Sequence, residues 1–161
     1  MKDDLGTWFS TLGEPLGDAE RSEIHAYLQG LGVKASLPAL VVESWSQAGS
    51  IVRNPAGDWW DAEEAERGRL ETRAHLDPAD PEWLAATETL HGAAAVAATR
   101  SGVSDPGLIR AAAGAAGYAA YQYRLARAAG ASSDHPFVQK YALFCGGRWP
   151  LGVYSDRFAI F

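Results

Sequence analysis

The sequence contains a single cysteine, Cys145, among its 161 residues. One thiol cannot close an intramolecular disulfide, and it cannot supply the several sulfur ligands of a structural zinc site. The most apolar region, residues 93–129, is interrupted by charged residues and a proline, whereas a membrane-spanning helix needs about 20 consecutive apolar residues. Residues 1–6 lack the apolar stretch of a signal peptide. The sequence therefore predicts a cytoplasmic protein with no membrane partner.

Signatures of catalysis and of cofactor binding are also scarce. No serine lies in a Gly-x-Ser-x-Gly motif. The glycine pair Gly146 and Gly147 follows an expected helix, whereas a phosphate-binding loop precedes one. We therefore expect no cofactor, and the sequence favours a non-enzymatic protein without excluding an enzyme.

Positive charge is scarce in the first part of the chain. Residues 1–99 hold 7 Lys and Arg against 17 Asp and Glu, whereas residues 100–161 hold 7 against 3, and the net charge is −6. Nucleic-acid binding needs cations that replace the counterions of the phosphates. An acidic surface instead attracts a basic protein. We expect a basic protein partner and no nucleic acid.

What is present is ordinary globular composition with clear helix signals. Apolar residues make up 47% and charged residues 21% of the chain, and this length is typical of one domain. Caps, prolines and glycines delimit periodic segments that begin at Asp18, Ser36, Asp58, Asp80, Asp105 and Asp134. The sequence predicts a mainly α, single-domain bundle of about six or seven helices over residues 1–161.

The last residues change character. Residues 149–161 contain strand formers on both sides of Ser155 and Asp156, which predicts a short β-hairpin. Two strands are marginal alone, so we expect Phe158, Ile160 and Phe161 to anchor the hairpin on the helices. The two alanine-rich helices expected around residues 92–98 and 111–120 allow close approach of their axes. We predict an intimate antiparallel pair, with the large aromatic residues filling the rest of the core.

One motif suggests a metal site. Glu88 and His91 form a Glu-x-x-His on a helix, the spacing with which di-iron bundles present two ligands to one metal. The best companion pair, Glu71 and His75, has a spacing of four. A small helical metalloprotein or enzyme using these four residues is therefore an alternative function. The other interpretation of the motif is a surface histidine on a polar helix face.

A second segment suggests a recognition surface. Two adjacent tryptophans lie among acids at an expected helix start, and adjacent helical residues cannot both face the core. Exposed aromatic side chains surrounded by charge are typical of interface hot spots. The alternative is a solvated acidic face with both tryptophans packed under a neighbouring helix. The residues of this predicted partner-binding surface are Asp58, Trp59, Trp60, Asp61, Glu63, Glu64 and Glu66.

A third candidate site is the segment Arg-Trp-Pro-Leu-Gly at residues 148–152. Arg148 could stack on Trp149, or the segment could be a structural corner that leads into the hairpin. Together with residues 140–144 and 158–161, this segment resembles the tail of small bacterial toxin-immunity proteins over about the last quarter of the chain. The resemblance implies a cytosolic protein that binds one toxin domain and blocks it.

The preferred hypothesis is an immunity or inhibitor protein that neutralises a basic toxin domain, such as a nuclease, through its acidic, tryptophan-bearing surface. A structural or regulatory homo-oligomer, such as a dimer packed through the alanine-rich helices, is a further alternative. The sequence does not identify the partner or the oligomeric state.

Overall fold

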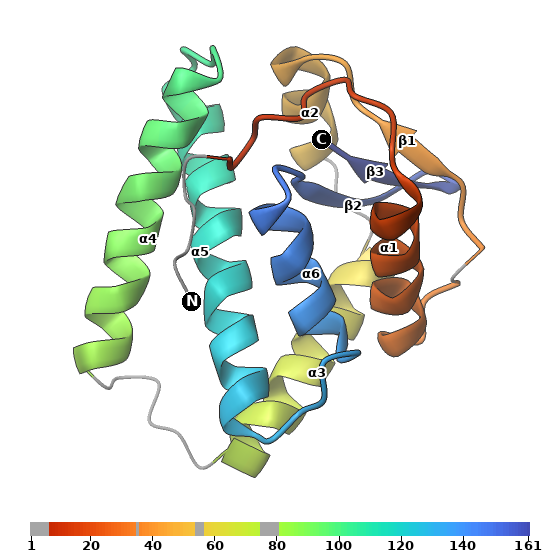
Figure 1. The fold of residues 1–161 in the computed structure, drawn as a ribbon, viewed down its shortest axis with the longest axis vertical. Helices are drawn as coiled ribbons and strands as arrows, with labels where there is room; N and C mark the ends of the chain where they lie inside the picture. The colour runs from red at the N-terminus through yellow and green to blue at the C-terminus, as the bar shows by residue number, and fades with distance from the viewer. Residues whose placement is uncertain (1–6, 35, 54–56, 75–80) are drawn as a thin grey trace.

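A computed structural model describes residues 7–34, 36–53, 57–74 and 81–161. Within these ranges the chain forms six helices and a three-stranded sheet (Figure 1), which confirms the predicted helical bundle with a C-terminal hairpin. The elements in chain order are α1 (Asp18–Gly30), β1 (Ala39–Val41), α2 (Trp45–Val52), α3 (Gly57–Ala74), α4 (Pro81–Arg100), α5 (Pro106–Ala128), α6 (Pro136–Cys145), β2 (Pro150–Tyr154) and β3 (Arg157–Ile160).

The predicted alanine-rich pair is α4 and α5, which lie side by side along most of their length (Figure 1). Ala94 and Ala98 of α4, and Ala112 and Ala116 of α5, are completely buried. A Cβ atom added at Gly117 of α5 would lie 3.8 Å from the Cβ of His91 in α4. Side chains of this size let the two helix axes approach closely, as the sequence predicts.

Helices α2, α3 and α6 contact α5, and α1 packs on α6. Helix α6 contacts both α5 and α1, and α3 crosses α5 near the lower end of the view in Figure 1. Among the described residues, none of the helices combines the length and the apolar character that a membrane span requires.

The sheet contains one strand that the sequence analysis misses. β3 pairs antiparallel with β2, as predicted, but it also pairs in parallel with β1. The helix expected to begin after Ser36 is therefore wrong in its first part. Ser44 is the true N-cap, with its hydroxyl accepting a hydrogen bond of 3.1 Å from the Gln47 N–H. The preceding Leu-Val-Val run at 40–42 instead continues the sheet through a bond from the Val42 N–H to the Ile160 carbonyl (2.9 Å).

A smaller correction concerns the start of α6. Its N-cap is His135, whose Nδ1 accepts from the Phe137 N–H at 3.2 Å. Asp134, the predicted cap, accepts a hydrogen bond from the Ser132 hydroxyl instead. The carboxylate of Asp134 is used within the preceding turn, so the ring nitrogen one residue later satisfies the first turn of the helix.

Aromatic side chains fill the core beside the alanine pair, as expected. Phe9, from the segment before α1, has ring contacts of 5.6–6.4 Å between centroids with four partners. These partners are Trp45, Phe144, Trp149 and Phe161. The predicted hairpin anchors Phe158, Ile160 and Phe161 are fully buried. Aromatic contacts of this kind join the sheet to the helices.

Candidate functional site

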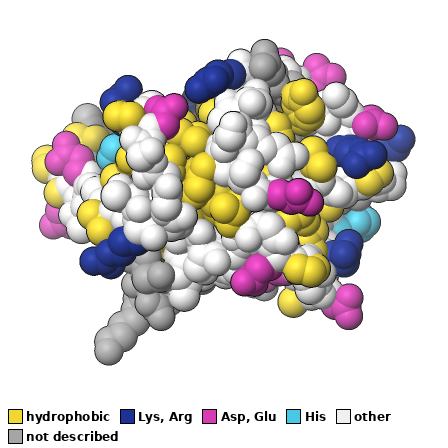
Figure 2. All heavy atoms as spheres, turned by 90° about the horizontal axis from the view of Figure 1, so that it is seen from above, with side chains coloured by type: hydrophobic (Ala, Val, Ile, Leu, Met, Phe, Trp, Pro, Cys, Tyr) yellow, Lys and Arg dark blue, Asp and Glu magenta, His cyan; other side chains and the backbone are white. Residues whose placement is uncertain are grey.

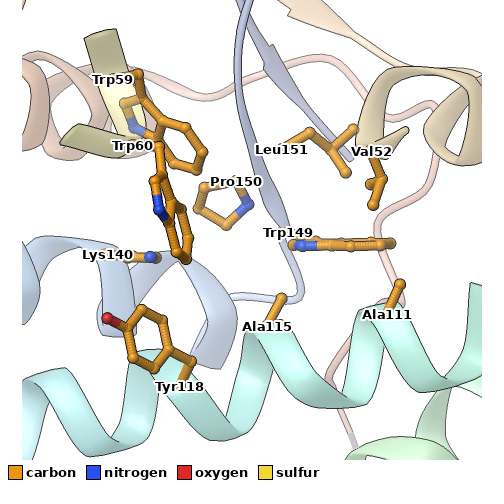
Figure 3. Close-up of a pocket in the computed structure, with 10 residues that line it drawn as sticks. All are labelled: Val52, Trp59, Trp60, Ala111, Ala115, Tyr118, Lys140, Trp149, Pro150 and Leu151. Carbon is orange, nitrogen blue, oxygen red and sulfur yellow. The ribbon is translucent and has the colours of Figure 1, made fainter. Parts of the chain in front are cut away.

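A cavity of about 340 Å³ opens where α3, α5 and β2 meet, beside the end of α2 (Figure 3). Aromatic and small apolar side chains form most of its wall. The residues that line this cavity, called here the aromatic pocket, are Val52, Trp59, Trp60, Ala111, Ala115, Tyr118, Lys140, Trp149, Pro150 and Leu151.

The space of the pocket arises from a contrast in side-chain size. Trp60 stacks on Tyr118 with 5.9 Å between ring centroids and an interplanar angle of 28°. Trp149 lies across the pocket from Trp60 (Figure 3), with Ala115 of α5 between them and Ala111 beside the far end of the Trp149 ring. Because alanine fills little volume, the aromatic rings stand apart and leave an opening. Trp60 is 44% exposed, so it presents an aromatic edge to solvent.

The second tryptophan forms the inner wall. Trp59 is buried, and its indole N–H donates to the Tyr27 hydroxyl at 2.8 Å. Its ring also lies against the backbone of β2 at Gly152, where φ is +102°. A Cβ atom at this position would be only 2.6 Å from Cζ3 of Trp59. Glycine is thus required here both by the backbone conformation and by the close approach of the indole.

A buried ion pair lies behind this wall. The Lys140 ammonium is 2.6 Å and 2.8 Å from the two carboxylate oxygens of Glu63, and it donates to the Gln122 side-chain oxygen at 3.0 Å. Both charged side chains are almost completely buried. The ammonium also lies 5.7 Å from the ring centroids of Trp59 and Tyr118, over the faces of these rings. The charges of Lys140 and Glu63 cancel, so the polar part of the wall has no net charge.

Tyr27 completes the buried cluster. Its hydroxyl donates to Glu63 Oε1 at 2.5 Å while it accepts from the Trp59 indole. Burial, the charge of Glu63 and the hydrogen bond to it raise the pKa of Tyr27 well above its usual value. Tyr27 thus remains a neutral donor, and the Glu63 carboxylate accepts three hydrogen bonds, one from Tyr27 and two from Lys140.

A chain of polar contacts runs along the outer edge of the pocket between α3 and α5. The Tyr118 hydroxyl donates to Glu64, and the Tyr121 hydroxyl donates to Glu71 at 2.6 Å. Arg67 binds both carboxylates, at 2.9 Å and 2.6 Å. Hydrogen bonds from Arg67 lower the pKa of Glu64, and burial raises the pKa of Tyr121 to about 12. These contacts hold Tyr118 against Trp60.

The structure divides the predicted partner-binding surface into exposed and internal residues. Asp58, Trp60 and Asp61 are exposed. The expectation that Glu63 lies in an exposed acidic ring is wrong, because its side chain is fully buried against Lys140. The prediction that one of the two adjacent tryptophans is exposed is confirmed, and Trp59 is the internal one.

The other two acids of the predicted ring are half-buried. Glu64 binds Tyr118 and Arg67, as described, and Glu66 lies 3.1 Å from both His135 and Arg69. On the face seen in Figure 2, hydrophobic side chains are exposed near the middle, with acidic and basic side chains scattered around them.

Lys140 is a site residue that no motif of the sequence singles out. Lys140 is the only charged residue of α6, within an otherwise mostly apolar helix. A lone lysine among buried positions signals a buried cation that needs a partner. Tyr118 carries no comparable signal, because an aromatic residue at such a position is usually core, and Trp149 is singled out only through its place in the Arg-Trp-Pro-Leu-Gly segment.

The metal-site alternative finds no support in the described ranges. Glu88 and His91 are exposed on α4, and Glu71 is bound to Tyr121 and Arg67. His75 lies outside the described residues. Within the part of the chain that the structure describes, no three His, Cys, Asp or Glu side chains are grouped so that they could hold a metal ion.

The Arg-Trp-Pro-Leu-Gly segment is an internal corner. Arg148 is 2% exposed, and its guanidinium turns toward the N-terminal segment rather than toward Trp149. It donates to Glu20 at 2.6 Å and to three backbone carbonyls at 2.8–2.9 Å. These carbonyls belong to Thr11, Glu14 and Pro15. The corner joins the end of α6 to the segment before α1 and positions Trp149 and Pro150 in the pocket wall.

The chain matches no family model, and searches of curated proteins and of solved structures also give no match.

Proposed function

We propose that this protein is a non-enzymatic binding protein and that its partner is a basic protein domain. The observation that carries the proposal is the position of Trp60, exposed at the mouth of a preformed aromatic pocket and beside the exposed acids Asp58 and Asp61. Large aromatic residues at such pockets dominate the energy of many protein interfaces. Neighbouring charges accelerate association with a partner of opposite charge.

The polar groups of the pocket wall favour binding over catalysis. A lysine ammonium has three N–H donors, and Lys140 has three acceptors within 3.0 Å, two on Glu63 and one on Gln122. The ammonium is thus held as a structural cation. A nucleophilic amine would need to be neutral and directed at a substrate. The pocket offers shape and aromatic faces to a ligand.

The resemblance of the C-terminal quarter to toxin-immunity proteins gives this partner a more specific identity. On that resemblance, the protein is a cytosolic bacterial immunity protein, and its partner is a basic toxin domain such as a nuclease. The acids Asp58 and Asp61 would then pair with cations that the toxin otherwise directs at phosphates. The net charge of −6 supports the same direction of attraction.

The test uses the purified protein and each basic protein encoded by a neighbouring gene, with affinity measured by calorimetry. We expect Trp60→Ala to weaken binding by about 30-fold or more, as at a hot spot worth at least about 2 kcal/mol. We expect Asp58→Asn with Asp61→Asn to slow association mainly at low salt. The control is Tyr154→Ala, which truncates an aromatic side chain that is 40% exposed on β2 and lies outside the pocket lining. The proposal is overturned if no such protein binds, or if Trp60→Ala binds as tightly as the unchanged protein.

A second candidate function is self-association through α4. Leu84 and Val96 are 51% and 49% exposed on this helix, which packs against α5. Large exposed apolar side chains on one helix favour a helix–helix interface between copies. Measurement of mass in solution over a range of concentrations distinguishes the two, because a concentration-independent monomer has no such interface.

A further inference from the structure

We infer that the aromatic pocket takes an uncharged apolar side chain of the partner and rejects a cationic one, and that Lys140 determines this specificity. The inference rests on the proposed function and adds the chemistry of the inserted group. In this arrangement the basic residues of the partner remain outside the pocket, beside Asp58 and Asp61. The inserted side chain is aromatic or branched aliphatic.

The walls fit an apolar group of limited size. Trp60, Trp149, Pro150 and Leu151 surround an opening above Ala115 (Figure 3). The cavity volume of about 340 Å³ is at the small end of ligand pockets, which range over about 300–1,000 Å³. Flat rings on several sides give an apolar side chain many dispersion contacts.

An aromatic pocket of this kind would ordinarily also attract a cation. Ammonium and guanidinium groups bind over the faces of tryptophan and tyrosine rings within about 6 Å of the centroid. Here the protein's own cation already occupies that position, because the Lys140 ammonium lies 5.7 Å from both the Trp59 and the Tyr118 centroids. A second cation in the pocket would lie next to this positive charge, because Lys140 lines the pocket and its partner Glu63 does not.

The buried carboxylate cannot compensate an incoming charge either. Glu63 already accepts from the Lys140 ammonium through both oxygens and from the Tyr27 hydroxyl. An incoming cation would therefore lose its hydration without gaining a new acceptor. An incoming anion meets the same difficulty, since the three N–H groups of Lys140 are directed at Glu63 and Gln122. A neutral side chain avoids both costs.

The exposed acids explain where the partner's positive charge goes. Asp58 and Asp61 lie in the first turns of α3, on either side of Trp59 and Trp60 in sequence, and both are exposed. Basic residues that flank the inserted side chain would meet these carboxylates in water, where an ion pair requires little desolvation. The pocket and its edge thus separate two roles, with apolar contact inside and charge attraction outside.

The test is ¹⁹F NMR of the full chain labelled with 5-fluorotryptophan, which replaces all six tryptophans. The probes are the N-acetyl amides of leucine, phenylalanine and lysine, titrated separately. We expect the leucine and phenylalanine probes to shift the resonances of the pocket residues Trp59, Trp60 and Trp149. The resonances of Trp8 and Trp83, which lie outside the pocket lining, should not move. The lysine probe should bind at least tenfold more weakly.

Two substitutions test whether the probes bind in the aromatic pocket and whether Lys140 determines their selectivity. Ala115→Phe fills the pocket from α5 and should abolish the shifts, whereas the control Ala85→Phe adds the same ring to an exposed position of α4 and should leave them unchanged. Lys140→Met should increase the affinity for the lysine probe at least tenfold in any folded fraction, because Glu63 and the two ring faces then lack their cation. If Lys140→Met does not fold, the inference is still tested by the selectivity of the unchanged protein and by the Ala115→Phe variant.

The inference is overturned if the lysine probe binds as well as the neutral probes, if no probe moves the pocket resonances, or if Ala115→Phe retains the shifts. These outcomes differ from failure of the proposed function. A basic partner whose binding depends on Trp60, together with equal binding of all three probes, would refute the specificity alone. Selective binding of the neutral probes, with no basic protein partner, would refute the proposed function and leave a site for a neutral small molecule.

Discussion

Replacement of Lys140 by methionine is the most direct test of how the pocket wall is held. The substitution keeps an unbranched side chain of similar length and removes the ammonium that binds Glu63 at 2.6 Å and 2.8 Å. Glu63 then keeps its hydrogen bond from Tyr27 but has no cation within the core. An unpaired charge in this position is strongly unfavourable in the folded state.

The magnitude follows from the burial of the pair. Relative side-chain exposure is 5% for Lys140 and 0% for Glu63, and removal of one partner from such a pair costs about 3–5 kcal/mol of folding free energy. A chain of this size has a urea m-value of about 2 kcal/mol/M. The midpoint of urea unfolding should therefore fall by about 1.5–2.5 M.

The assay is urea unfolding followed by circular dichroism, with three comparison variants. Lys34→Met removes a lysine from an exposed position and should leave the midpoint within about 0.3 M of the unchanged protein. Glu63→Leu alone should be strongly destabilising, like Lys140→Met. The double variant should recover much of the loss, because it replaces both buried charges with apolar groups.

The reasoning would be refuted if Lys140→Met shifted the midpoint no more than Lys34→Met. It would also be refuted if the double variant lost as much as the two single variants added together, since independent losses mean that the two charges do not interact. Full recovery is not expected, because Tyr27 and Gln122 would lose their charged partners.

Three further predictions concern the surroundings of the pocket. Gly152→Ala should destabilise the fold by about 2 kcal/mol or more, measured by urea unfolding, because the new methyl group meets Trp59 at a backbone φ of +102°. Arg148→Lys should cost at least about 2 kcal/mol in the same assay, because an ammonium cannot reach all the carbonyls that the guanidinium binds. Burial raises the pKa of Tyr27 in the folded state, so the folded chain binds more protons than the unfolded chain above about pH 10, and stability should fall with pH there by up to about 1.4 kcal/mol per pH unit. Tyr27→Phe should reduce that slope in unfolding curves collected between about pH 10 and pH 11.5, and the slope that remains should come from Tyr118 and Tyr121, whose pKa values are also raised in the folded state.

Local signals were sufficient for most of the fold. Asp105 followed by Pro106 predicts the start of α5, and the Asp105 carboxylate indeed accepts from the Gly107 N–H at 2.7 Å. Strand β1 could not be predicted in this way. Its three residues depend on pairing with β3, more than 110 positions later in the chain, and no local pattern contains that partner.

Local sequence patterns also could not predict the opening of the pocket. It depends on Trp149 and Pro150 lying opposite Trp60, and that arrangement requires the buried Arg148 corner to fix the end of α6 against the N-terminal segment. The sequence marks this segment as a corner but does not say which elements the corner joins. Contacts of Arg148 span more than 120 positions along the chain.

The burial of Glu63, in contrast, can be predicted from the helix periodicity of α3. Positions 59, 63, 66 and 70 share one helix face, and this face contains the buried Trp59 and Leu70. Glu63, one turn after Trp59 on this face, is therefore expected to be buried, and a buried carboxylate needs a cation. The acidic composition of the segment suggested a continuous charged ring, whereas the period of the helix assigns its acids to three different environments. Periodicity decides here because a side chain's direction is fixed by its position on the helix, whatever the charge of its neighbours.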